Sequence, residues 1–117
     1  MSVSKYLSVI GAIYLLFFTS AGPNPMRAGE KQEEETKVLY KAKCASCHGL
    51  DGSATTAVGK KLKAKDLRLP ETQKLSDEKL FQTIAKGRDK MPAFVRSLGE
   101  DKCHQLVAYI RGLAKKE

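Results

Sequence analysis

The pentapeptide Cys44-Ala45-Ser46-Cys47-His48 decides how the rest of this sequence is interpreted. The pattern C-x-x-C-H is the attachment sequence of c-type haem. Two thiols three positions apart, near the end of a helical turn, can each add across one vinyl group of the porphyrin. The imidazole of His48 then falls beneath the iron, and neutral imidazole is a common iron ligand. The motif therefore predicts one covalently attached haem c, held by Cys44 and Cys47, with His48 on the iron.

Two other kinds of site share part of this pattern. A redox dithiol of the thioredoxin type normally follows a strand in a βαβ unit, whereas the residues before Cys44 have helical periodicity. A zinc site would need further ligands, and Cys103 and His104 are the available pair. Adjacent residues diverge on a helix or a strand, and this pair lacks the usual spacing of zinc ligands. Both alternatives stay open, and the motif favours haem.

The composition indicates one small, basic domain. The chain has 117 residues, 21 Lys and Arg against 13 Asp and Glu, a formal net charge of +8, and three cysteines. An odd number of cysteines excludes a complete disulfide framework and agrees with two thioethers plus one further thiol. So small a domain has a thin core, to which a buried porphyrin would add apolar surface. No nucleic-acid-binding motif accompanies the positive charge, so we expect no nucleic-acid partner.

Residues 1–21 have the organisation of a signal peptide. Lys5 precedes an apolar segment, residues 6–18, and small residues at 19–21 occupy the usual cleavage positions, with Ala28-Gly29 as a weaker second choice. The alternative is an uncleaved anchor formed by residues 6–21. Glycine and prolines at 22–25 cut that stretch short of a comfortable span of roughly 20 residues. In both cases we expect periplasmic localisation, with membrane contact only if the segment is uncleaved.

The rest of the chain is predicted to form a flexible leader, residues 22–32, and one all-α domain, residues 33–117. A first helix is expected to begin at Glu33, lead into the haem motif and carry an apolar stripe of Val38, Leu39, Ala42 and Ala45. Tyr40 is expected in the core. Residues 49–65 contain the glycines of a loop and a run of exposed lysines.

Two further helices are predicted after this loop. The first of these lies between Ser76, a natural N-cap, and Gly87, a plausible residue just past the helix end. Its apolar face holds Leu80, Phe81, Ile84 and Ala85. The last helix extends from about Glu100 to Lys116, with one face formed by Cys103, Leu106, Val107, Ile110, Leu113 and Ala114. Cys103 is therefore expected in the core and His104 toward solvent.

A haem iron bound by His48 has a second axial position. Met26, Met91, His104 and the lysines are the candidate ligands, but Met26 lies in the leader and His104 on a polar helix face. Met91 lies in the turn Arg88–Phe94, which Pro92 stiffens, and a turn of that length can present sulfur to the opposite face of the haem. Position and flanking residues therefore favour Met91.

Three segments in this order resemble a bacterial class I cytochrome c. They are C-A-S-C-H-G at Cys44–Gly49, G-R-D-K-M-P-A-F at Gly87–Phe94 and L-V-A-Y-I-R-G-L at Leu106–Leu113. The resemblance extends from about Glu33 to the C-terminus. It implies thioethers at Cys44 and Cys47, His48 as proximal and Met91 as distal ligand. It also implies an all-α cytochrome c fold in which three to four short helices wrap around one covalently bound haem.

Two positions depart from the family pattern. Relatives often have Gly at the position of Thr36, where the terminal helices cross, so a wider contact is expected here. Many relatives also have Gly-Pro-x-Leu where this chain has Gly59-Lys60-Lys61-Leu62. In those relatives the proline carbonyl commonly accepts the N–H of the proximal histidine. The Lys60 carbonyl is the expected equivalent.

The expected function is electron transfer and not enzyme catalysis. Ligation by His and Met favours Fe(II). The geometry of an iron centre with two fixed ligands changes little between Fe(II) and Fe(III), which suits a one-electron carrier. The positive charge of the lysines beside the motif predicts acidic-surfaced redox proteins or membrane respiratory complexes as partners. We expect the protein to be a monomer. Two alternatives stay open: a dedicated electron-entry subunit of one oxidoreductase, and a ligand sensor or peroxidatic haem protein if Met91 is not bound.

Overall fold

The computed structural model describes residue 22 and residues 24–114, so the expected signal peptide, residues 1–21, lies outside the described part. Within that part the chain is all-α, as expected, and contains seven helices where three to four were expected. They are α2 (Pro25–Lys43), α3 (Ala45–His48), α4 (Ala57–Leu62), α5 (Pro70–Gln73), α6 (Asp77–Lys86), α7 (Val95–Leu98) and α8 (Glu100–Gly112). No helix among the described residues has the length and apolar character needed to cross a membrane.

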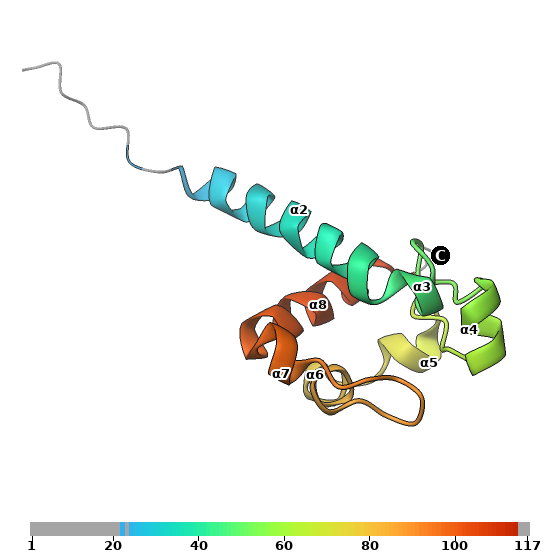
Figure 1. Ribbon diagram of the computed structural model, residues 1–117. Coiled ribbons are helices and arrows are strands. Elements are labelled where there is room, and N and C mark those ends of the chain that lie inside the picture. The colour runs from blue at the N-terminus through green and yellow to red at the C-terminus, as the bar shows by residue number, and fades with distance from the viewer. Residues whose placement is uncertain (1–21, 23, 115–117) are drawn as a thin grey trace, which may run out of the picture.

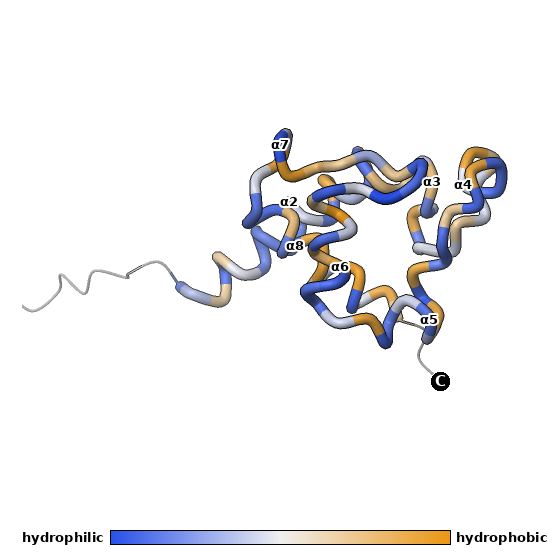
Figure 2. Tube along the Cα trace, turned by 90° about the horizontal axis from the view of Figure 1, so that it is seen from below, coloured by the Kyte–Doolittle hydropathy of each residue, from blue (hydrophilic) through white to orange (hydrophobic). Residues whose placement is uncertain are grey.

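The long helices α2, α6 and α8 form the frame of the fold (Figure 1). Helix α8 packs against α2, α6 and α7, and the short helix α3 packs against α2 and α4. Hydrophobic and hydrophilic positions are interspersed along α6 and α8, as expected for amphipathic helices (Figure 2). Ser76 caps α6 by accepting a hydrogen bond from the Lys79 amide, and Gly87 ends that helix with a φ of 73°, as predicted.

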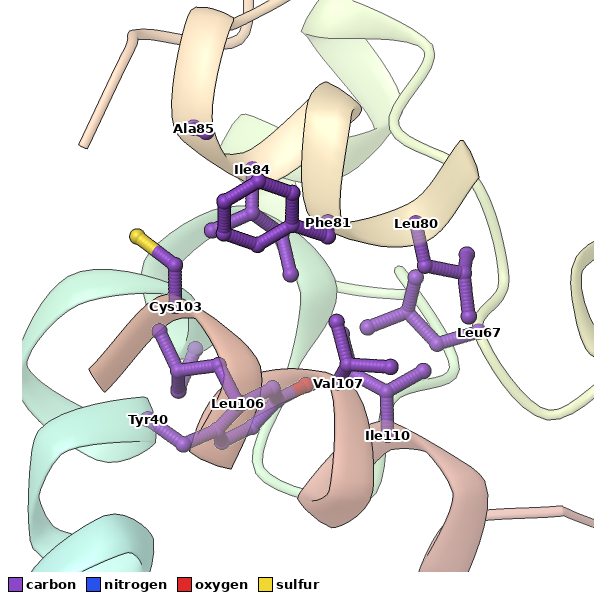
Figure 3. Packing of buried hydrophobic residues seen from close by; sticks show 11 residues of the cluster. Tyr40, Leu67, Leu80, Phe81, Ile84, Ala85, Cys103, Leu106, Val107 and Ile110 are labelled. Atoms are coloured by element: carbon purple, nitrogen blue, oxygen red, sulfur yellow. The ribbon is translucent and has the colours of Figure 1, made fainter. Parts of the chain in front are cut away.

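The core lies where α2, α6 and α8 meet, and Figure 3 shows its side chains. Every residue predicted for the apolar face of α6 is buried. On α8 the predicted face is buried from Cys103 to Ile110. The helix ends at Gly112 and not near the predicted Lys116, so Leu113, its C-cap, is half-buried and Ala114 beyond it is exposed. Tyr40, Leu106 and Cys103 are the largest fully buried side chains. Cys103 is therefore a core residue, as predicted.

Helix α2 differs from the prediction at its start and in its buried face. It begins at Pro25 and not near Glu33, because the Asn24 side chain accepts a hydrogen bond from the Met26 amide and Pro25 suits the first helical position. Residues 25–32 of the expected leader are therefore helical in the structure. The predicted stripe was wrong for Val38 and Ala42, which are exposed, and confirmed for Ala45, which is buried, and Leu39, which packs against the core. Tyr40 is buried in the core, as predicted, and Thr36, one turn before it, is buried as well.

The crossing of α2 and α8 leaves room beside it. Thr36 is buried, and its hydroxyl donates to the Gln32 carbonyl at 2.7 Å. A groove of about 510 Å³ lies between the two helices and is lined by Thr36 and Tyr109, among others. The wider helix contact expected from threonine in place of glycine stays a prediction.

Arg111 on α8 holds the chain between α5 and α6. Its guanidinium donates to the Gln73 carbonyl at 2.6 Å, to the Leu75 carbonyl at 2.5 Å, and to the Asp77 carboxylate at 2.6 and 2.9 Å. Arginine suits this position because its planar fork carries five N–H donors. The loop that leads into α6 is thus tied to the last helix.

We expect Arg111→Ala to lower the free energy of unfolding by about 2 kcal/mol, because two loop carbonyls and Asp77 lose their donors together. Denaturant unfolding followed by circular dichroism measures the change. Arg96→Ala is the matched control, since Arg96 is an exposed arginine on α7. Equal unfolding midpoints for the two variants would contradict a structural role of these hydrogen bonds.

Candidate haem site

The C-x-x-C-H motif lies at the junction of α2 and α3. Cys44 is both the C-cap of α2 and the N-cap of α3, with φ −116° and ψ −37°. Its amide donates to the Tyr40 carbonyl at 2.8 Å, and its carbonyl accepts from the His48 amide at 2.9 Å. Gly49 then turns the chain with a φ of 80°, where the buried Tyr40 hydroxyl donates to the Gly49 carbonyl at 2.9 Å. The motif is therefore anchored at both ends by α2.

The two thiols of the motif are half-buried and belong to no disulfide. Burial raises the pKa of the Cys44 thiol to about 11, and the nearby Cys103 and Cys47 thiols add to that rise. Cys44 therefore keeps its proton at neutral pH. A thioether forms by net addition of S–H across a vinyl group, with sulfur bonded to one carbon and hydrogen to the other.

His48 is oriented by a backbone carbonyl. Its Nδ1 lies 2.8 Å from the Lys65 carbonyl oxygen, and because a carbonyl only accepts, Nδ1 carries the proton. The lone pair of Nε2 is then available for a metal, which is the usual arrangement of a metal-binding histidine and its orienting partner. The prediction that Lys60 supplies this carbonyl was wrong, because Lys65 supplies it. The Lys60 carbonyl instead accepts from the amide of Lys63, the C-cap of α4, at 3.3 Å.

The segment 49–65, expected to be a loop, contains α4, and that helix packs on the haem motif. Thr56 is its N-cap and accepts from the Gly59 amide at 2.9 Å. The sequence signal for this helix is Thr56, a residue type favoured at N-caps. The glycines of the segment suggested a loop instead. Lys63 ends α4 in the left-handed region, with a φ of 56°, and directs the chain toward Lys65.

Met91 ends a tight turn that two backbone hydrogen bonds close. The Met91 amide donates to the Arg88 carbonyl at 2.8 Å, and the Arg88 amide donates to the Met91 carbonyl at 3.1 Å. Gly87 permits this turn, because a Cβ there would lie 2.6 Å from the Met91 carbonyl oxygen. The side chain is half-buried and packs against the core. In Figure 1 the segment between α6 and α7, which contains Met91, lies at the bottom of the view, below α3.

The alternative zinc ligands Cys103 and His104 lie in different surroundings, although Cys103 is near Cys44. Cys103 is fully buried in the core, whereas the exposed His104 stacks on Phe81, with ring centroids 4.1 Å apart. Among residues 22 and 24–114 there is no group of three or more His, Cys, Asp or Glu side chains that could hold a metal ion. The described residues therefore lend no support to the zinc interpretation.

Lysines surround the motif on the α4 side. Lys60 and Lys61 belong to α4, Lys63 is its C-cap, and Lys65 follows, and all four side chains are exposed. Exposed basic residues also flank Met91, namely Lys86, Arg88 and Lys90. Both chain segments that hold candidate iron ligands are therefore basic at their surface.

The donor set agrees with haem c. Two free, half-buried thiols at the C-x-x-C spacing, an imidazole with a free Nε2 and a half-buried thioether at Met91 are the groups that such a haem requires. Zinc in a structural site would instead need four converging nitrogen, sulfur or oxygen ligands.

Residues 31–110 match the family model described as cytochrome C oxidase, cbb3-type, subunit III. The solved structure of the KustC0563 c-type cytochrome resembles the chain with 34% sequence identity and a TM-score of 0.64. The match covers 68% of this chain and 98% of that one. The chain therefore belongs to the cbb3-type cytochrome c oxidase subunit III family and is a class I, single-haem cytochrome c, an electron carrier with covalently bound haem c.

Proposed function

We propose that this cytochrome is a periplasmic one-electron carrier, with its haem attached through Cys44 and Cys47 and its iron bound by His48 and Met91. When bound, the haem supplies an iron centre that cycles between Fe(II) and Fe(III). The observation that carries the proposal is the orientation of His48, whose Nδ1 proton is held by the Lys65 carbonyl so that Nε2 is free. An imidazole fixed in this tautomer is prepared for the proximal position.

The chain supports electron transfer by holding both candidate ligands still. His48 is fixed by its Lys65 partner, and Met91 by the turn that Arg88 closes. Groups that do not move on oxidation keep the reorganisation cost of electron transfer low. Methionine as the second ligand raises the reduction potential, as does burial of the site.

The test is expression of the chain with c-type maturation machinery, followed by absorption spectra of the oxidised and reduced protein. Covalent haem is expected, together with the near-red charge-transfer band of a Met–Fe(III) bond. The double variant Cys44→Ala/Cys47→Ala should yield no covalent haem. Failure of the unaltered chain to bind haem, where a c-type control matures, would refute the proposal.

The exposed lysines near the motif are proposed to steer an acidic redox partner. We expect Lys61→Glu/Lys65→Glu to slow electron exchange with such a partner about tenfold at low ionic strength, with the difference shrinking as salt is added. Stopped-flow absorbance measures the rate. Lys31→Glu/Lys37→Glu makes the same charge change on α2 and is the control, because those lysines lie in exposed pairs with Glu35 and Glu34. Equal slowing by both variants would indicate a general charge effect and contradict local docking.

A dedicated oxidase subunit is the second candidate, favoured by the description of the matching family as subunit III of an oxidase. Purification of the tagged protein from its native membranes distinguishes the two roles. A carrier should elute alone after a salt wash, whereas a permanent subunit should retain its oxidase.

A further inference from the structure

We propose that Thr56 is a positioning residue for the proximal histidine, fixing His48 through the backbone of the haem motif. The inference rests on the proposed function, because it concerns the residue that binds the iron. Three backbone groups converge on the Thr56 hydroxyl. Its oxygen lies 2.8 Å from the Ser46 carbonyl, 3.1 Å from the Cys47 carbonyl and 2.9 Å from the Gly59 amide nitrogen.

The chemistry of a hydroxyl assigns each of these contacts. One O–H donates, shared between the two carbonyls, and a lone pair accepts from the Gly59 N–H. The two carbonyls belong to the last residues of α3, where helical partners are missing because the helix ends at His48. A single side chain therefore satisfies the C-terminal end of α3 and the N-terminal end of α4.

The opposite end of α4 reaches the same histidine. Its C-cap, Lys63, adopts the left-handed conformation, and the Ala64 amide donates back to the Gly59 carbonyl at 2.9 Å. That turn brings the Lys65 carbonyl to His48 Nδ1. Helix α4 is thus connected to the haem motif at both ends, to the motif backbone through Thr56 and to the imidazole through Lys65.

Loss of the Thr56 hydroxyl should loosen the contact between α4 and the motif backbone, and it should thereby weaken the hydrogen bond between His48 and Lys65. That hydrogen bond makes the imidazole a stronger donor, and a stronger donor stabilises Fe(III). A weaker bond therefore raises the reduction potential. It also lets the Nδ1 proton exchange faster with solvent.

The experiment compares haem-loaded wild type, Thr56→Val, Thr56→Ser and Thr83→Val. Valine matches threonine in shape but lacks the hydroxyl, and serine restores it. Thr83 is the matched control because it is also half-buried and donates to a backbone carbonyl, that of Lys79 within α6, at 2.8 Å. Redox titration gives the potential, and proton NMR of the reduced protein gives the exchange rate of the His48 Nδ1 proton.

For Thr56→Val we expect a raised potential and Nδ1 exchange faster by about tenfold, the factor that the loss of one typical hydrogen bond corresponds to. Thr56→Ser and Thr83→Val should resemble wild type in both measurements. If Thr56→Val fails to bind haem while Thr56→Ser binds it, that result also supports the role of the hydroxyl in positioning the haem motif.

Three results would overturn the inference: no change in Thr56→Val, equal changes in Thr83→Val, or a Thr56→Ser variant that behaves like valine or fails to bind haem. Each of these leaves the proposed electron carrier intact, since wild type would still bind haem and show its Met–Fe(III) band. Failure of wild type to bind haem would overturn both proposals, and it is recognised before any variant is compared.

Discussion

Replacement of Met91 by alanine is expected to abolish the near-red charge-transfer band while the haem stays covalently attached. The reason is that the variant lacks the thioether sulfur that we propose as the iron ligand, whereas the thiols of Cys44 and Cys47 are untouched. The reduction potential should fall by more than about 0.1 V, since axial ligands alter haem potentials over a range of roughly 0.8 V. Absorption spectra and redox titration measure the two effects.

Met26→Ala is the matched control for this experiment. Met26 lies at the start of α2 with 74% of its surface exposed, so its loss should change neither the band nor the potential. The reduced Met91→Ala protein should also bind carbon monoxide much faster than wild type, because one axial position becomes open. A charge-transfer band that survives in Met91→Ala would exclude Met91 as the ligand. Wild-type protein that already binds carbon monoxide rapidly would favour the sensor or peroxidatic alternative.

Gly59→Ala is expected to prevent accumulation of the haem-loaded protein, or to lower its free energy of unfolding by about 3 kcal/mol or more. A Cβ at this position would overlap the Cys47 carbonyl oxygen, and it would lie 2.9 Å from both the Ala54 carbonyl oxygen and the Thr56 hydroxyl. Two of these neighbours are backbone atoms, which cannot rotate away. Helix α4 would therefore have to separate from α3, and the Lys65 carbonyl would move with it.

The yield of covalent haem and denaturant unfolding of any mature protein measure this effect. Gly29→Ala is the control, because a Cβ at Gly29 in α2 meets nothing within 4 Å. There alanine should be neutral or stabilising by about 0.5–1 kcal/mol, since glycine loses more backbone freedom in a helix. A Gly59→Ala protein as stable and as well loaded as Gly29→Ala would show that α4 can shift without cost to the site.

Local patterns predicted the helices that have amphipathic sequences and clear caps. Ser76 and Gly87 delimit α6, and the spacing from Cys103 to Ile110 identified the buried face of α8. On α2 the pattern was only partly right: Tyr40 is buried as predicted, but Val38 is exposed and Thr36 is buried in its place. Which side chains of α2 are buried depends on how α8 packs against it, and the sequence of α2 alone does not specify that packing.

The sequence by itself determined the chemistry: the C-x-x-C-H spacing implied haem c, and the order of three motifs implied the family to which the chain belongs. Only the tertiary structure decided which groups orient His48. The Lys65 carbonyl, 17 positions away, occupies the place expected of Lys60, and Thr56 ties the motif to α4. Every residue has a carbonyl, so no residue type marks the one that is used. The path of the chain through α4 selects it.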